Sequence, residues 1–272
     1  MDAPKLTFER RETKFLLSAG QREALEALAQ AHMRPDEHGP ATVRSVYYDT
    51  PTYLLARRSA ERPAYKEKVR TRAYGRPHPF DPVFVELKKK HDGVVYKRRC
   101  QLSPTEAREL LAGRGRPRTQ IERELDWAAR SYEGLHPAAF LAYERVAWVD
   151  AEGRDLRLTF DENIRARWED VELAGDDAGV ALTQPGQVLL EVKSMYAMPL
   201  WLVGFLSAEK IRKTSFSKYG GAFRLMVAER GLGIASGSCD LSAPASARHL
   251  RRVPLAPDSL VQDRLAQPAP SR

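Results

Sequence analysis

Charged and apolar side chains alternate along several predicted strands, and this pattern constrains the fold more than any other feature. Neighbouring side chains of a strand point to opposite faces, so Lys66, Lys68, Arg70 and Arg72 share one face of segment 64–74. Strands are predicted for residues 6–15, 42–49, 64–74, 83–90, 94–102, 141–150, 155–167 and 187–195. Many of them carry lysines, arginines and a few acids on one face and apolar residues on the other.

Turn and cap signals place these strands in an α+β protein. Asp92-Gly93 has the signature of a hairpin turn, and Glu152-Gly153 separates another adjacent pair of strands. Helices are predicted after the capping boxes that start at Ser18 and Ser103, and for residues 119–129, 199–206 and 218–230. Many hairpins and few helices favour an antiparallel sheet or barrel over alternating strands and helices.

The charge of the chain indicates an anionic partner. The formal net charge is +8 and the isoelectric point is about 9.5. Two like charges about 4 Å apart repel by roughly 4 kcal/mol at an effective dielectric near 20. Solvent exposure explains one charged strand face, but the repeated excess of Lys and Arg favours a face that holds a polyanion. If the sheet closes, this face lines a tunnel for phosphate.

Composition defines one large domain and a tail. Residues 1–234 are predicted to form the domain, and residues 235–272, rich in Pro, Ala, Ser and Arg, a flexible basic tail. We find no signal peptide, and the apolar stretch 195–206 is shorter than the roughly 20 residues that span a bilayer. Cys100 and Cys239 fit no disulfide or zinc pattern. We therefore expect a cytoplasmic protein, for which work at a membrane would need a membrane-protein partner.

A series of short motifs runs in order along the chain. They are RRETKF at 10–15, SVYYDT at 45–50, KVRTR at 68–72, VELK at 85–88, KRR at 97–99, LEVK at 190–193 and FSKY at 216–219. Their order resembles VTC-type polyphosphate polymerase domains of the triphosphate tunnel metalloenzyme (CYTH-like) superfamily, over residues 6–230. The resemblance implies an eight-stranded, closed antiparallel β-barrel with helices outside. It also implies transfer of phosphate from ATP to a growing inorganic polyphosphate chain.

The resemblance assigns roles to individual residues. Catalytic phosphate contacts are expected from Arg70, Arg72, Lys88, Arg145 and Arg157. Further phosphate contacts are expected from Arg10, Lys14, Lys68, Lys97, Arg99, Lys193, Lys213 and Lys218. Ser215 stands where the family member compared has a lysine, and Arg212 or Lys213 is expected to replace that lysine.

Glu191 matches the family's metal ligand, and Glu12 and Glu86 are further candidates. Mn²⁺ or Mg²⁺ takes oxygen ligands from one or two carboxylates and from substrate phosphates. For Glu12 and Glu86, a salt bridge that tunes nearby bases is an equally good interpretation.

Two other functions stay open at this point. A tripolyphosphatase or nucleoside triphosphatase on the same scaffold needs the same bases and metal. A non-catalytic nucleic-acid-binding barrel would need aromatic side chains among its bases for stacking, and Tyr65 and Tyr96 fall on the opposite strand face. We therefore expect no specific nucleic-acid partner.

Overall fold

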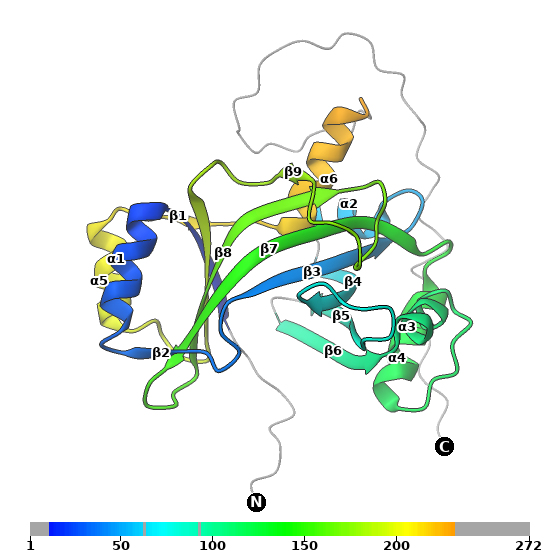
Figure 1. Ribbon diagram of the computed structural model, residues 1–272, viewed down its shortest axis with the longest axis horizontal. Coiled ribbons are helices and arrows are strands. Elements are labelled where there is room, and N and C mark those ends of the chain that lie inside the picture. The colour runs from blue at the N-terminus through cyan, green and yellow to red at the C-terminus, as the bar shows by residue number, and fades with distance from the viewer. Residues whose placement is uncertain (1–10, 62–63, 92–93, 232–272) are drawn as a thin grey trace, which may run out of the picture. The chain divides into compact units, whose positions relative to one another are not determined.

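The computed structural model describes residues 11–61, 64–91 and 94–231 (Figure 1). The chain divides into two units, Met1–Met226 and Val227–Arg272, and the first holds the whole sheet. The predicted domain boundary at residue 234, the predicted tail and Cys239 lie outside the described residues.

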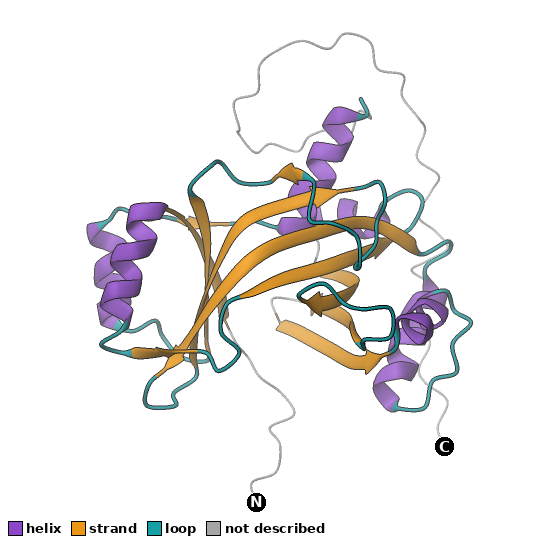
Figure 2. Ribbon diagram, in the orientation of Figure 1, coloured by secondary structure: helices purple, strands orange, loops and turns teal. Residues whose placement is uncertain are grey.

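One antiparallel sheet of eleven strands organises the first unit (Figure 2). Its order is β11-β1-β10-β8-β7-β3-β4-β5-β6, with β2 paired to β7 and β9 paired to β8. The strands are β1 (Arg11–Ser18), β2 (Met33–Pro35), β3 (Ala41–Asp49), β4 (Tyr65–Tyr74), β5 (Val83–His91), β6 (Val94–Leu102), β7 (His136–Asp150), β8 (Leu156–Arg167), β9 (Val180–Ala181), β10 (Gln187–Ser194) and β11 (Lys213–Thr214). Each predicted strand overlaps one of the eight long strands.

The helices begin largely where the cap signals place them. They are α1 (Ala19–Ala29), α2 (Leu54–Glu61), α3 (Pro104–Leu111), α4 (Gln120–Ser131), α5 (Leu200–Ala208) and α6 (Lys218–Glu229). Both predicted capping boxes are confirmed, Ser18 with Gln21 and Ser103 with Glu106. Helix α2 was not predicted. The amide groups of its first turn donate to the side chain of Asp49, which lies at the end of β3 and gives no local cap signal.

Two apolar layers cover the outer face of the sheet. Helices α1 and α5 pack on one part of it (Figure 1). There Leu25 and Leu202 belong to one apolar cluster with Leu158 and Leu190 of the sheet. Helices α2, α3 and α4 cover the strands at the β6 end, in a separate core. The apolar strand residues therefore face these helices and leave the opposite face to the charged residues.

The prediction of a closed barrel is wrong. Strand β11 pairs with β1 at Lys14 and Phe15, on the edge of β1 that would otherwise receive β6. Among the described residues, β1 and β6 therefore have no backbone pairing, and the sheet stays open between them.

The open sheet nevertheless curls strongly. Lys88 Nζ on β5 lies 3.2 Å from Glu12 Oε2 on β1, although these strands stand near opposite ends of the sheet order. Lys68 on β4 donates to Ser217, which directly precedes α6. The charged rows therefore converge on a shared space, and we call the sheet face that carries them the inner face.

Candidate phosphate-binding site

A buried carboxylate on β10 lies among four cations of the inner face. Glu191 Oε1 lies 3.3 Å from Lys14 Nζ and 3.1 Å from Lys218 Nζ. Its Oε2 lies 3.4 Å from Lys193 Nζ and 3.5 Å from Arg145 Nη2. Burial raises the pKa of Glu191, but these four cations outweigh burial and hold the pKa well below its ordinary value. Glu191 is therefore ionised and binds the surrounding strands together.

Asp161 on β8 forms the second acidic centre. Both of its oxygens accept from Arg145, at 2.6 and 2.7 Å, and Lys218 Nζ lies 2.5 Å from Oδ2. Burial raises the pKa of Asp161, and Lys218 and Arg145 reverse that effect and lower it. The sequence analysis did not select this residue, although its alternation with Phe160 places it on the charged face.

Glu86 on β5 holds three cations of the neighbouring strands. Its carboxylate lies 2.6 Å from Arg70, 2.8 Å from Lys97 and 3.3 Å from Arg99. The salt-bridge interpretation of Glu86 thus has direct contacts, and the carboxylate fixes how these cations are presented.

Glu12 on β1 shares a cation with Glu191. Lys14 Nζ lies 3.3 Å from Glu12 Oε1 and 3.3 Å from Glu191 Oε1. Burial raises the pKa of Glu12, but Lys88, Lys14 and Lys193 outweigh it and lower the pKa to about 2. These two ionised carboxylates are the pair of predicted metal ligands that the structure brings together, whereas Glu86 lies with other cations.

A divalent ion would need ligands from its substrate as well. In the described part of the chain, no group of three His, Cys, Asp or Glu side chains is arranged to hold a metal ion. Two carboxylate groups completed by phosphate oxygens suit Mg²⁺ or Mn²⁺. The donor set therefore fits a metal that arrives with a polyphosphate.

Two cations of β4 form their hydrogen bonds with neutral groups. Arg72 is 5% exposed and donates to the hydroxyls of Ser45 and Tyr143. Lys68 Nζ lies 3.1 Å from Ser217 Oγ, and burial with nearby lysines lowers its pKa to about 8. Within the described ranges, neither side chain forms an ion pair with a carboxylate. Because burying a charge without a directly paired counter-ion is costly, both positions suit an anionic ligand.

Tyr47 on β3 lies against these cations. Its hydroxyl accepts from Arg70 at 2.7 Å, and its ring stacks on Tyr219 of α6 with centroids 4.5 Å apart. Burial raises the pKa of Tyr47, but Arg70, Arg72 and Lys68 outweigh burial and bring it down to about 8. The sequence analysis quoted Tyr47 within the motif at 45–50 but did not place it in the site.

The inner face is not polar throughout. Val43, Tyr143, Ile164 and Leu189 form a buried apolar group against which Phe216 packs. This group lies beside the cations that contact Tyr143 and Glu191, so it restricts the space available to a ligand and to water.

Two predicted phosphate contacts lie apart from this cluster. Arg157 lies beside Lys193 in the sheet, but its side chain is 43% exposed and lies 3.0 Å from Asp36. Lys213 is exposed and pairs with Phe15, which belongs to the outer core. Arg10 lies outside the described residues. The assignment of these three to phosphate stays a prediction, and the cluster gives it no support.

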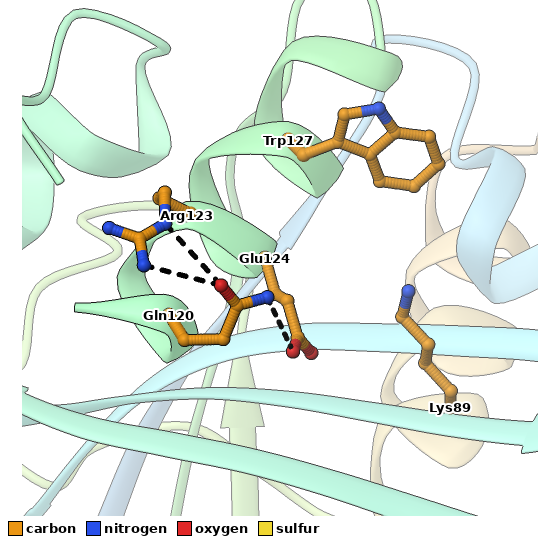
Figure 3. Close-up of a pocket in the computed structure, with 5 residues that line it drawn as sticks. All are labelled: Lys89, Gln120, Arg123, Glu124 and Trp127. Atoms are coloured by element: carbon orange, nitrogen blue, oxygen red, sulfur yellow. Dashed lines mark hydrogen bonds between the residues drawn. The ribbon is translucent and has the colours of Figure 1, made fainter. Parts of the chain in front are cut away.

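A separate hollow opens on the outer side of the sheet (Figure 3). Lys89 lies over the ring of Trp127 at 5.4 Å, and Arg123 donates to Gln120 beside Glu124. Lys89 alternates with Lys88 along β5 and so points away from the inner face. The hollow is therefore distinct from the candidate site.

The structure is an α+β protein whose inner face gathers lysine and arginine side chains around a few carboxylates. The family model of the VTC domain matches residues 9–227, and the chain therefore belongs to the VTC domain family. Comparison with curated proteins by sequence gives no match. In the described part of the chain, no helix combines the length and the apolar character that crossing a membrane requires.

Solved structures resemble the chain in a general way. A "putative adenylate cyclase" from Bacillus halodurans is 15% identical, with a TM-score of 0.48 over 78% of this chain and 94% of that chain. A "putative adenylyl cyclase" from Hippeastrum with a dominant triphosphatase activity is 16% identical, with a TM-score of 0.44 over 83% of this chain and 98% of that chain. Because both scores are below 0.5, these structures add nothing to the family assignment.

Proposed function

We propose that this protein transfers the terminal phosphate of a nucleoside triphosphate, ATP for example, to a growing inorganic polyphosphate chain. The observation that carries the proposal is the pair of cations Lys68 and Arg72, whose hydrogen bonds end on neutral hydroxyls at the centre of the inner face. Phosphate oxygens would supply the missing negative charge. Membership of the VTC domain family supports the same substrate class.

The chemistry needs alignment and charge neutralisation more than a strong base. Phosphoryl transfer proceeds through a transition state whose charge spreads over the transferred group. Arg70 and Arg72 present planar forks that bind phosphate oxygens in pairs, and Glu86 orients Arg70 through a contact of 2.6 Å. The acceptor is a terminal phosphate that is already charged, so this chain's residues align it and no side chain has to remove a proton.

A divalent ion, Mn²⁺ or Mg²⁺, fits the carboxylates Glu12 and Glu191. When bound, such an ion neutralises charge on the transferred phosphate. Lys14, which contacts both carboxylates at 3.3 Å, would then exchange part of its ion pairing for the phosphate.

The test is to incubate the purified protein with ATP and Mn²⁺ and to separate the products by length. Long phosphate chains with little free phosphate are expected. Stoichiometric release of free phosphate without chains would contradict the polymerase and establish a hydrolase on the same site. Reactions with chelator in place of the metal serve as the control.

A further inference from the structure

The inner wall formed by β4, β5 and β6 changes its chemistry along its length. On β4 the inner residues run from Lys68 through Arg72 to Tyr74, and on β5 they run from Lys88 to Phe84. One end of this wall is therefore lined by lysines, and the other end carries aromatic rings. The sequence analysis considered Tyr65 and Tyr96 and did not identify Tyr74 and Phe84 as aromatic residues of the charged face.

Tyr74, Phe84 and Arg99 form a packed group there, which we call the aromatic ledge. The rings of Tyr74 and Phe84 lie edge to face, with centroids 6.0 Å apart and planes at 78°. The guanidinium carbon of Arg99 lies 3.4 Å from the Phe84 centroid and 5.8 Å from that of Tyr74. Arg99 also donates to the Tyr74 hydroxyl and lies 3.3 Å from Glu86. The Tyr74 ring is thus held in place before any ligand arrives.

The exposure of Tyr74 distinguishes the ledge from ordinary core packing. Tyr74 remains 50% exposed, whereas Tyr143 and Tyr47, on the same sheet face, are 2% and 6% exposed. Two residues along β4 lies Arg72, and a strand advances about 7 Å over that interval. An open aromatic ring therefore stands next to a buried cation whose hydrogen bonds go to the neutral hydroxyls of Ser45 and Tyr143.

We propose that the aromatic ledge binds the nucleobase of the nucleoside triphosphate, by stacking of the base on Tyr74. The inference rests on the proposed function, because it assigns a binding place to the nucleoside part of the same phosphate donor. Bases stack on aromatic side chains with little regard for their identity, so the ledge would accept any nucleobase.

The ledge also gives the donor a direction. With the base at Tyr74, the triphosphate extends along β4 past Arg72 and Arg70 toward Lys68 and Lys88. The acceptor chain then approaches from the lysine end of the wall. The nucleoside triphosphate therefore enters at the aromatic end of the wall, and the acceptor chain enters at the lysine end.

Calorimetric titration of Tyr74→Leu with ATP and, separately, with tripolyphosphate tests the assignment. The Kd for ATP should rise about tenfold, as expected for one lost stacking contact. The Kd for tripolyphosphate should stay unchanged. Tyr74→Phe, which keeps the ring, should bind ATP like the parent. Phe84→Leu provides a second variant that loosens the same ledge.

Tyr96→Leu is the matched control. Tyr96 is 45% exposed on the same sheet but lies on the outer face, opposite Lys89. It should leave both affinities unchanged. Equal losses of affinity for ATP and tripolyphosphate in Tyr74→Leu, or no loss of affinity for either, would overturn the proposal that the ledge binds the base.

The proposal of polymerase activity and the proposal of base binding at the ledge can fail separately. Hydrolysis of ATP without chain synthesis would refute the first proposal. If Tyr74→Leu then lost affinity for ATP alone, the second proposal would still be supported. Chain synthesis by the parent, together with unchanged ATP affinity in Tyr74→Leu, would refute only the proposal that the ledge binds the base.

Discussion

Lys218 Nζ, on the first residue of α6, lies 3.1 Å from Glu191 Oε1 on β10. Both side chains are 8% exposed, and the same lysine also contacts Asp161. The helix therefore supplies a cation to the acidic centre of the inner face. The site is therefore complete only when the start of α6 lies against the sheet.

Glu191→Gln should destabilise the fold as well as stop turnover. Removing one partner of a buried ionic cluster leaves the other charges without compensation, which costs about 3 kcal/mol. Urea unfolding measures this loss. Glu144→Gln, at a 44% exposed side chain paired with Arg165, should lose less than about 1 kcal/mol. Equal losses in the two variants would show that the cluster around Glu191 contributes nothing special.

Tyr219→Phe should weaken the connection between α6 and α2. The Tyr219 hydroxyl donates to Asp49 at 2.6 Å, and Asp49 in turn accepts from the amides of Leu55 and Ala56. A buried hydrogen bond to a charged group contributes about 1.5 to 3 kcal/mol, and the free energy of unfolding should fall by about that amount. Tyr196→Phe, at a ring that is 70% exposed, is the control. A loss of similar size in the control would refute the role given to Asp49.

Tripolyphosphate binding should weaken as the pH rises through about 8. The pKa of Lys68 is lowered to about 8, so this lysine loses its positive charge there. The pKa of Tyr47 is also about 8, so its phenol gains a negative charge over the same range. Both changes disfavour a polyanion, and full affinity therefore belongs to the lower side of this range.

The double variant Lys68→Arg/Tyr47→Phe isolates that effect. Arginine keeps its charge throughout the range, and phenylalanine does not ionise. Titrations at pH 7 and pH 9 should show a clear fall in affinity for the parent and a smaller change for the double variant. Because the ligand's own titration affects both proteins equally, identical pH profiles would contradict the assignment.

Metal removal should separate binding from turnover. Tripolyphosphate contacts the cations directly, so its affinity should persist in chelator, reduced by no more than about tenfold. ATP turnover should stop in chelator and return when Mn²⁺ or Mg²⁺ is added. Glu12→Gln should raise the metal concentration needed for half-maximal turnover. Turnover that continues undiminished in chelator would refute the metal site at Glu12 and Glu191.

Local signals predicted most of the elements. Strand β6 has the predicted bounds, 94–102, and the side-chain hydrogen bonds of Ser18 and Ser103 begin their helices as expected. These elements depend on alternation and on partners three residues away, which a sequence displays directly. Strand β1 was expected to begin at residue 6, and the part before Arg11 lies outside the described residues.

The open sheet and part of the candidate site depend on contacts between residues far apart in the chain, which local sequence signals do not show. The two residues of β11 carry no strand signal of their own, yet their pairing with β1 leaves the sheet open. Asp161 belongs to the site because Lys218 reaches it from a helix 57 residues further along the chain. Lys213 was chosen by its position in the sequence, and the pairing with Phe15 turns it away from the inner face.

Titration of tripolyphosphate into Arg72→Gln tests the central claim most directly, because Arg72 is buried and hydrogen-bonded to neutral Ser45 and Tyr143. Arg98→Gln is the matched control, since Arg98 lies on the same sheet but pairs with Glu124 of α4 on the outer side. We expect Arg72→Gln to weaken binding at least about tenfold and Arg98→Gln to leave it unchanged. Equal affinities in the parent and in Arg72→Gln would contradict the claim that the inner face binds phosphate.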